Sequence, residues 1–142
     1  MCEIPKQDFQ ELSTEEAHTL IADAANLNPN SIVFSGGEPL LRKDIFDLIS
    51  FTNSLKINTC LTSNGVLIDD ELAKQLYFSK IGVINISIEG REEVHDALRG
   101  KGNFRKAVNA LEDLSRHKIE TTIASLVCRH NYDSLAYVME LA

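Results

Sequence analysis

The 142-residue sequence has no tryptophan, 3 prolines, 3 cysteines and no hydrophobic run near the ~20 residues that span a membrane. Its net charge of −7 argues against an extended surface for nucleic acid or anionic lipid, because such surfaces are basic. The N-terminus lacks the basic and apolar regions of a signal peptide. Cys2, Cys60 and Cys128 are too far apart for a disulfide framework. These absences predict a reduced, cytoplasmic protein with neither nucleic-acid nor membrane partners.

Helix-forming and strand-forming patterns alternate along the chain. A capping box of Ser13 and Glu16 predicts the start of an amphipathic helix. Apolar runs predict strands at 31–34, 57–62, 82–88 and 120–127, the first of them buried, and helical periodicity predicts helices within 12–27, 43–55, 69–80, 103–117 and 132–142. The predicted inward-facing residues are Ala17, Leu20, Ile21, Ala24, Ile45, Leu48, Ile49, Thr52, Phe104, Ala107, Val108, Leu111 and Leu114. Repeats of about 30 residues of this kind form parallel sheets, so an open doubly wound sheet or part of a (β/α) barrel fits.

The predicted strands share a feature at their carboxyl ends, where parallel α/β folds bind ligands. Small, polar or ionisable residues follow the strands at 35–39, 62–65, 87–90 and 128–131. The opposite strand ends carry connectors that look merely structural. This asymmetry predicts one ligand site on one rim of the sheet.

The first of these segments, Ser35-Gly36-Gly37-Glu38-Pro39, matches neither a P-loop nor a dinucleotide-binding fingerprint. A glutamate repels phosphate and attracts an ammonium group. The glycines allow a ligand to approach the backbone closely, and Pro39 favours an extended Glu38. The segment predicts a rigid loop for a small cationic or zwitterionic ligand, and an ordinary strand-to-helix turn stays open as the alternative.

Four segments together resemble one family. Residues 34–45 (FSGGEPLLRKDI) resemble the Gly-Gly-Glu-Pro motif of radical S-adenosylmethionine enzymes, and residues 61–68 (LTSNGVLI) resemble the third-strand segment of that family. Residues 86–111 resemble the fourth strand and following loop of its peptide-modifying and molybdenum-cofactor-like branches, and residues 126–135 resemble the fifth-strand end. The resemblance covers nearly the whole chain in order, and it is specific to the superfamily rather than to a subgroup.

The resemblance implies a partial parallel (β/α) barrel, similar to a TIM barrel, in which residues 1–142 form a single core domain. The chain would hold the second to fifth strands and lack the first and sixth, as if truncated at both ends. Complete enzymes of the family cleave S-adenosylmethionine reductively at a [4Fe–4S] cluster and abstract hydrogen from a substrate. A small-molecule or peptide substrate is therefore expected, with an electron donor such as ferredoxin or flavodoxin. Missing strands would expose two sheet edges, which predicts self-association.

The resemblance also assigns roles on the rim. Ser35, Gly36, Gly37, Glu38 and Pro39 would hold the amino group of S-adenosylmethionine, Ser87 its ribose and Arg99 its carboxylate. Further contacts would come from Thr62, Ser63, Asn64 and Glu89. Structural alternatives exist for several of these residues: a turn at 62–64, a bond to a strand-end carbonyl for Ser87, a solvated charge for Arg99, and substrate contact or a cap for Glu89.

The cluster motif of the family, C-x3-C-x2-C, is absent. Cys2 lies ten residues before Leu12, the spacing of the motif's third cysteine, and is the one candidate ligand. Cys60 and Cys128 are predicted to be small buried hydrophobes, and His95-Asp96 is predicted to be a packing contact within its loop. One cysteine cannot hold a cluster, so the chain alone is not expected to cleave S-adenosylmethionine. The alternatives are a cluster-less S-adenosylmethionine- or nucleotide-binding or interaction module, and an unrelated flavodoxin-like domain.

Overall fold

The computed structural model describes residues 11–142, and Cys2 lies outside the described residues. The chain forms α1 (Thr14–Ala25), β1 (Ser31–Phe34), the 3-10 helix η1 (Pro39–Leu41), α2 (Ile45–Ser54), β2 (Asn58–Ser63), α3 (Asp70–Phe78), β3 (Val83–Ser87), α4 (Glu92–Arg99), α5 (Asn103–Arg116), β4 (Glu120–Ala124), the 3-10 helix η2 (Tyr132–Ser134) and α6 (Leu135–Leu141). Across residues 11–142, no helix is both long and apolar enough to cross a bilayer.

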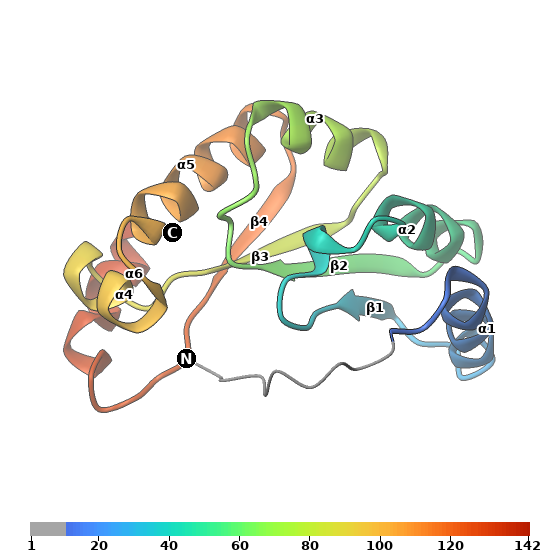
Figure 1. Ribbon diagram of the computed structural model, residues 1–142, viewed down its shortest axis with the longest axis horizontal. Coiled ribbons are helices and arrows are strands. Elements are labelled where there is room, and N and C mark those ends of the chain that lie inside the picture. The colour runs from blue at the N-terminus through green and yellow to red at the C-terminus, as the bar shows by residue number, and fades with distance from the viewer. Residues whose placement is uncertain (1–10) are drawn as a thin grey trace.

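The four strands form a parallel sheet in the order β1-β2-β3-β4, which confirms the predicted α/β architecture. The helices α2, α3 and α5 lie on the same side of this sheet (Figure 1). Because all strands run in one direction, their carboxyl ends meet at one edge of the sheet. Within the described part of the chain, β1 and β4 are the edge strands.

Among residues 11–142, helices cover only one face of the sheet, and the burial of the strand residues alternates accordingly. On β3, Ile84 and Ile86 are fully buried, whereas Val83 and Asn85 are half-buried. The main core on the covered face includes Ile45, Ile49, Leu61, Ile68, Ala73, Leu76, Ile84, Ile86, Ile88, Phe104, Ala107, Ala110, Leu114 and Val138. The predicted inward faces of α2 and α5 are therefore confirmed, with Val108 and Leu111 half-buried at the margin of the core.

Helix α1 begins at the predicted capping box. The N–H of Glu16 donates to Ser13 Oγ at 3.2 Å, and the N–H of Ser13 donates to Glu16 Oε2 at 2.8 Å. Ala17 and Ile21 of α1 pack with Leu48 of α2 in a second buried cluster. Helix α1 thus covers the β1 end of the structure through its contact with α2.

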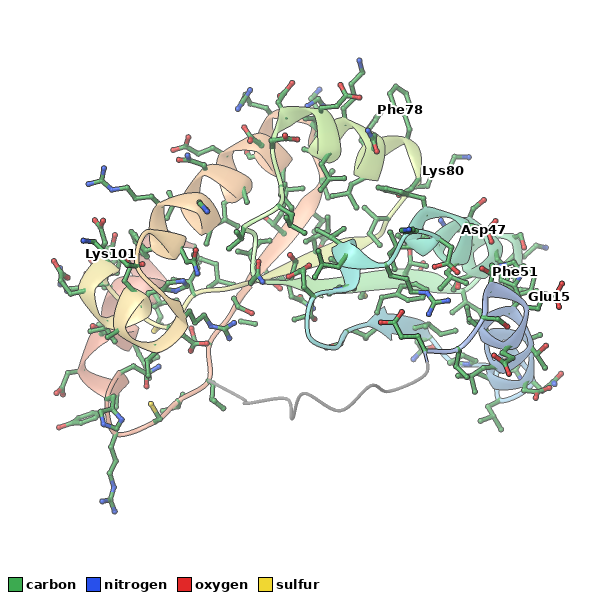
Figure 2. All side chains as sticks on the ribbon, viewed as in Figure 1. Glu15, Asp47, Phe51, Phe78, Lys80 and Lys101 are labelled. Atoms are coloured by element: carbon green, nitrogen blue, oxygen red, sulfur yellow. The ribbon has the colours of Figure 1, made fainter. Side chains whose placement is uncertain are left out.

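One further contact joins α1 to α2. The ring of His18 stacks on Phe51 with 4.2 Å between the ring centroids, and His18 Nε2 lies 2.8 Å from Asp47 Oδ2. Figure 2 shows Asp47 and Phe51 of α2 next to α1. Leu20 was predicted to face inward but is exposed, because the buried stripe of α1 is narrow and runs only through Ala17 and Ile21.

Three further predictions about the secondary structure and the burial of a strand are wrong. Residues 92–99 were expected to be loop but form α4, which packs on α5 and buries His95. Strand β4 ends at Ala124 rather than at 127, because the Ser125 hydroxyl donates to the Ile88 carbonyl and the Leu126 N–H donates to the Glu89 carboxylate. Strand β1 was expected to be buried, but its residues are exposed or half-buried because it is an edge strand.

Each helix-to-strand turn before β1, β2, β3 and β4 contains a residue with positive φ. These residues are Asn28, Lys56, Lys80 and Lys118, with φ of 51°, 61°, 57° and 57°. The left-handed conformation after a helix is usually taken by Gly, because a Cβ destabilises it. At the three lysines, part of this conformational cost is offset because the positive side chain interacts favourably with the C-terminal end of the helix dipole.

Replacing Lys80 by glycine should stabilise the protein. We expect Lys80→Gly to raise the free energy of unfolding by about 0.5 kcal/mol, because it relieves the left-handed strain but loses the lysine charge. The matched control is Lys74→Gly within α3. This substitution should lower the free energy of unfolding by about 0.5–1 kcal/mol because glycine weakens a helix interior. Urea denaturation followed by circular dichroism measures both, and equal destabilisation by the two variants would contradict the strain argument.

Candidate functional site

The loop after β1 brings exposed backbone and an acidic side chain to the carboxyl edge of the sheet. Gly36 has a φ of 151°, a backbone conformation that residues with a Cβ rarely adopt. No heavy atom lies within 4 Å of the position that a Cβ would take at Gly36. Ser35, Gly36 and Gly37 are exposed. Glu38 has φ −149° and ψ 107°, the extended conformation predicted for the residue before Pro39.

The carboxylate of Glu38 joins the end of β1 to the end of β2. The Ser63 hydroxyl donates to Glu38 Oε1 and the Asn64 N–H donates to Glu38 Oε2, both at 2.9 Å. The N–H of Leu40 donates to Oε1 at 3.3 Å, so the same carboxylate caps η1. A carboxylate accepts about four hydrogen bonds, and Glu38 therefore keeps capacity for a cationic group.

The side chains of Ser63 and Asn64 serve the local backbone. Ser63 is 2% exposed, and besides donating to Glu38 its hydroxyl accepts the N–H of Gly65 at 3.0 Å. Asn64 Oδ1 accepts the N–H of Val66 at 2.8 Å. The turn alternative for these two residues is thus supported, and their contribution to the rim is to orient Glu38.

Thr62 belongs to a polar row that crosses three strands on the face without helices. It is aligned with Asn85 of β3, which is aligned with Thr122 of β4. Asn85 Nδ2 donates to Thr62 Oγ1 at 3.2 Å, and the Thr122 hydroxyl donates to Asn85 Oδ1. These three side chains form one hydrogen-bonded row leading across the sheet.

Asn85 and Thr122 were not among the predicted site residues. The signal was present in "VINIS" (83–87), where Asn85 and Ser87 alternate with buried isoleucines. Ser87, which is 7% exposed, therefore shares the face of Asn85 one step nearer the carboxyl edge. The open face of the sheet carries polar groups up to the rim.

Glu89 lies just after β3 and is bonded to three other segments. Arg99 is the last residue of α4. Glu89 Oε1 accepts hydrogen bonds from Arg99 Nε at 2.7 Å and from Arg99 Nη2 at 2.5 Å. Its Oε2 accepts from the N–H of Leu126, after β4, at 2.8 Å. Its own N–H donates to His95 Nδ1 at 3.2 Å. Arg99 is therefore an ion-pair partner of Glu89 and not a solvated charge.

The predicted contact between His95 and Asp96 is wrong. The Nδ1 atom of His95 accepts the Glu89 N–H, so the neutral ring carries its proton on Nε2. Burial holds the pKa of His95 below its usual value, and the charge of Arg99 acts in the same direction. His95 is thus a neutral, buried acceptor that supports the end of β3.

Asp96 instead caps the following helix. Its carboxylate accepts the N–H groups of Gly102 at 2.6 Å and Phe104 at 2.9 Å, at the start of α5. These backbone hydrogen bonds hold the pKa of Asp96 below its usual value. The contact ties α4 to α5 and so fixes the helix that carries Arg99.

The cysteines of the described residues do not form a metal site. Cys60 and Cys128 are free and only half-buried, so the prediction that both are buried hydrophobes is wrong. Cys60 is aligned with Val83 on the uncovered face. Among residues 11–142, no group of three His, Cys, Asp or Glu side chains could hold a metal ion.

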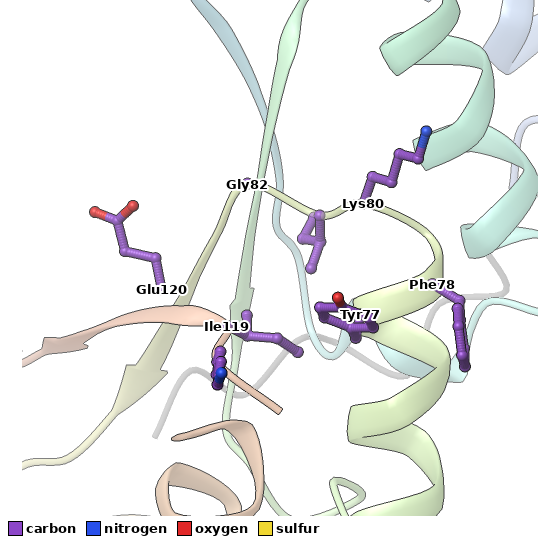
Figure 3. Close-up of a pocket in the computed structure, with 8 residues that line it drawn as sticks. Tyr77, Phe78, Lys80, Gly82, Ile119 and Glu120 are labelled. Atoms are coloured by element: carbon purple, nitrogen blue, oxygen red, sulfur yellow. The ribbon is translucent and has the colours of Figure 1, made fainter. Parts of the chain in front are cut away.

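A groove of about 500 Å³ lies at the opposite end of the sheet, near the starts of β3 and β4 (Figure 3). It is lined by Tyr77, Phe78, Lys80, Ile81, Gly82, Lys118, Ile119 and Glu120. None of the predicted site residues lines it. The groove is therefore separate from the polar rim at the carboxyl ends of the strands.

The chain is similar to known proteins over nearly its whole length. The family model described as "Radical SAM superfamily" matches residues 1–142. The Fe-coproporphyrin III synthase of Methanosarcina barkeri is 33% identical over 132 residues, which are 92% of this chain and 33% of that protein. The mycofactocin maturase MftC of Mycolicibacterium smegmatis is 35% identical over 139 residues, which are 96% of this chain and 36% of that protein. The chain thus spans about a third of the length of these curated relatives.

A solved structure gives the same picture of the fold. Native anSMEcpe with bound AdoMet (S-adenosylmethionine) and Cp18Cys peptide matches with a TM-score of 0.76 at 25% identity, over 94% of this chain and 40% of that chain.

Stability should fall as the pH drops below about 6.5, where the unfolded chain protonates its histidines. The lowered pKa of His95 means that the folded protein binds this proton less readily than the unfolded chain does. The contribution of His95 to the free energy of unfolding is therefore complete above about pH 6.5 and is lost as the pH falls. Protonation of His95 changes the free energy of unfolding by at most about 1.4 kcal/mol per pH unit. Urea denaturation between pH 5 and pH 7, with about 0.5 unit steps, measures it.

His95→Gln should reduce this slope, whereas His130→Gln on the exposed loop should leave it unchanged. Asp44 and Asp96 also have lowered pKa values, but their contributions are lost only as the pH falls below the ordinary value of 3.8. The pH range chosen therefore separates the histidine from these carboxylates. An unchanged slope in His95→Gln would contradict the assignment.

Proposed function

Because the chain belongs to the radical S-adenosylmethionine superfamily, we propose that it forms the part of such an enzyme's core that binds the amino acid end of S-adenosylmethionine. The parallel sheet β1–β4 is the partial barrel expected of the family. The observation that carries the proposal is the carboxylate of Glu38, which three donors fix beside the exposed glycine backbone. Residues 1–142 are proposed to form a single core domain.

The residues on the rim fit the amino acid end of this ligand, which carries one ammonium and one carboxylate group. Glu38 supplies a fixed negative charge for the ammonium group, and Gly36 leaves its backbone open to the ligand. Arg99 supplies a planar cation for the carboxylate, and Ser87 offers a hydroxyl for the ribose. S-Adenosylmethionine, when bound, would supply the 5′-deoxyadenosyl group for hydrogen abstraction once an external donor provides one electron, and these residues would bind and orient it.

The described residues do not fit an iron–sulfur cluster. Such a cluster requires several cysteine thiolates close together, and residues 11–142 offer only the separated Cys60 and Cys128. The [4Fe–4S] cluster, Cys2 as one of its ligands, and ferredoxin or flavodoxin as electron donor stay predictions from the family. The free cysteines are consistent with the predicted reducing, cytoplasmic location.

We propose a peptide as the substrate. Support comes from the peptide bound in the similar anSMEcpe structure and from the polar row on the open sheet face. Thr62, Asn85 and Thr122 present amide and hydroxyl groups, which match the donors and acceptors of a peptide backbone.

Glu38→Gln should weaken the binding of S-adenosylhomocysteine, an analogue that keeps the ammonium, carboxylate and adenosine groups. Loss of a charge-assisted hydrogen bond amounts to about 1.5–3 kcal/mol, or about 10- to 100-fold in the dissociation constant. Isothermal titration calorimetry with the chain measures the change. The matched control is Glu112→Gln on the exposed face of α5, which should bind like the wild type.

Circular dichroism should show that all these variants are folded. If the folded wild-type chain shows no saturable binding, or if Glu38→Gln binds as tightly as the wild type, the proposal is wrong. A decrease in Glu112→Gln equal to that in Glu38→Gln would mean that overall charge, and not the rim, controls the affinity.

A second candidate function is a binding module without a cluster, which is favoured by the separated cysteines of the described residues. Anaerobic reconstitution of a full-length version with iron and sulfide distinguishes the two candidates, because the described residues lack the cysteine set that a cluster needs. A brown chromophore absorbing near ~400 nm, as thiolate-bound iron–sulfur clusters give, supports the radical enzyme. S-Adenosylhomocysteine binding without such a chromophore supports the binding module.

We also propose self-association through the sheet edges, because β1 and β4 are unpaired on one side within the described residues. Val33→Lys places a charge on the exposed edge strand β1 and should shift the chain toward monomer. Leu27→Lys, in the exposed turn before β1, is the control and should have no effect. Multi-angle light scattering measures the mass, and a wild-type monomer at high concentration would contradict the proposal.

A further inference from the structure

Glu89 is a buried carboxylate that lies just after β3. It is 3% exposed, and both of its oxygens are occupied by donors of the protein. One oxygen accepts two N–H groups of Arg99, and the other accepts the backbone N–H of Leu126. A direct contact of this carboxylate with substrate would require one of these bonds to break.

Arg99 contacts Glu89 through one edge of its guanidinium group. The atoms involved are Nε and Nη2, which together form the side edge of the planar group. The group has five N–H donors in a fixed arrangement, and among residues 11–142 its side-chain hydrogen bonds use only the side edge, which leaves the end edge formed by Nη1 and the second N–H of Nη2 for a ligand. The side chain of Arg99 is 34% exposed, which allows that edge to be reached.

We propose that Glu89 is a positioning residue that holds the side edge of Arg99 and thereby presents its end edge to the carboxylate of S-adenosylmethionine. The inference rests on the proposed function, because it needs Arg99 to meet that carboxylate. The new element is that the two edges of the guanidinium group bind different partners: the side edge binds Glu89, and the end edge binds the ligand carboxylate. Glu89 stays paired with Arg99 when the ligand binds, and it does not touch the ligand.

The opposite possibility is that Glu89 competes with the ligand for Arg99. In that case Arg99 would leave Glu89 on binding, and a buried carboxylate would keep only the Leu126 N–H as partner. Breaking a buried ion pair is strongly unfavourable because the remaining charge is uncompensated. The anchoring of α4 by Asp96 at the start of α5 also restrains Arg99 near its present place. Both observations favour a permanent pair.

The two possibilities predict opposite signs for one substitution. Glu89→Gln removes the charge that holds Arg99, so a positioning role predicts about tenfold weaker binding of S-adenosylhomocysteine. Competition predicts tighter binding, because Arg99 would be released. Titration calorimetry of the chain distinguishes these outcomes, and unchanged or tighter binding overturns the proposal.

A second ligand shows whether the effect acts through the ligand's carboxylate. The aminopropyl analogue of S-adenosylhomocysteine, 5′-(3-aminopropylthio)-5′-deoxyadenosine, keeps the ammonium group and lacks the carboxylate. Glu89→Gln should leave the affinity for this analogue unchanged, whereas Glu38→Gln should weaken both ligands. Equal losses for the two ligands in Glu89→Gln would indicate general damage to the site and overturn the proposal.

The double variant Glu89→Gln/Arg99→Ala adds a test of coupling. A positioning role predicts that the Glu89 substitution has no further effect on S-adenosylhomocysteine binding once Arg99 is absent. Independent, additive losses overturn the proposal. If Glu38→Gln weakens S-adenosylhomocysteine binding and Glu89→Gln does not, this inference alone is wrong. If the wild-type chain does not bind S-adenosylhomocysteine, the proposed function is wrong as well.

A measurement on the wild-type chain keeps the test possible if the Glu89 variants do not fold. The Nε–H proton of Arg99, assigned by ¹⁵N NMR, should exchange slowly with water because it donates to a buried carboxylate. A permanent pair predicts that this protection persists when S-adenosylhomocysteine is added. Loss of protection on binding would show that Arg99 leaves Glu89, and the proposal would be wrong.

Discussion

The parallel pairing of β1 to β4 is the constraint on which the rest of the structure depends. It aligns Ser31 with Asn58 at one end and Ser87 with Ala124 at the other, so every carboxyl end reaches the same edge. In the described part of the chain, helices then cover one face and leave the other to polar side chains such as Asn85. A polar rim arises because four separate loops, distant in sequence, must all begin at that edge.

Two carboxylates organise this rim in different ways. Glu38 is half-buried and joins β1 to β2 while keeping acceptor capacity, which suits a site that receives a cation. Glu89 is buried and fully engaged, which suits a group that fixes a neighbouring side chain. The difference in burial is the physical basis of the two proposed roles, because a buried charge must keep its partners and a half-buried one can accept a new partner.

The order of the helices and strands could be predicted because it depends on local periodicity. The capping box at Ser13 and the inward faces of α2 and α5 follow directly from side-chain spacing. The prediction failed for α4, whose burial of His95 depends on packing against α5. It also failed for Asn85, whose bonding to Thr62 and Thr122 depends on the register of three strands.

The sequence by itself determined the parallel α/β class, the helix starts and the position of Glu38 in a rigid loop. These properties depend on spacing, capping and backbone restriction within a few residues. Only the tertiary structure decided that Ser63 orients Glu38, that Arg99 pairs with Glu89, and that β4 ends where Leu126 turns to the same carboxylate. Such pairings join residues 10 to 37 positions apart, and their geometry exists only once the strands are in register.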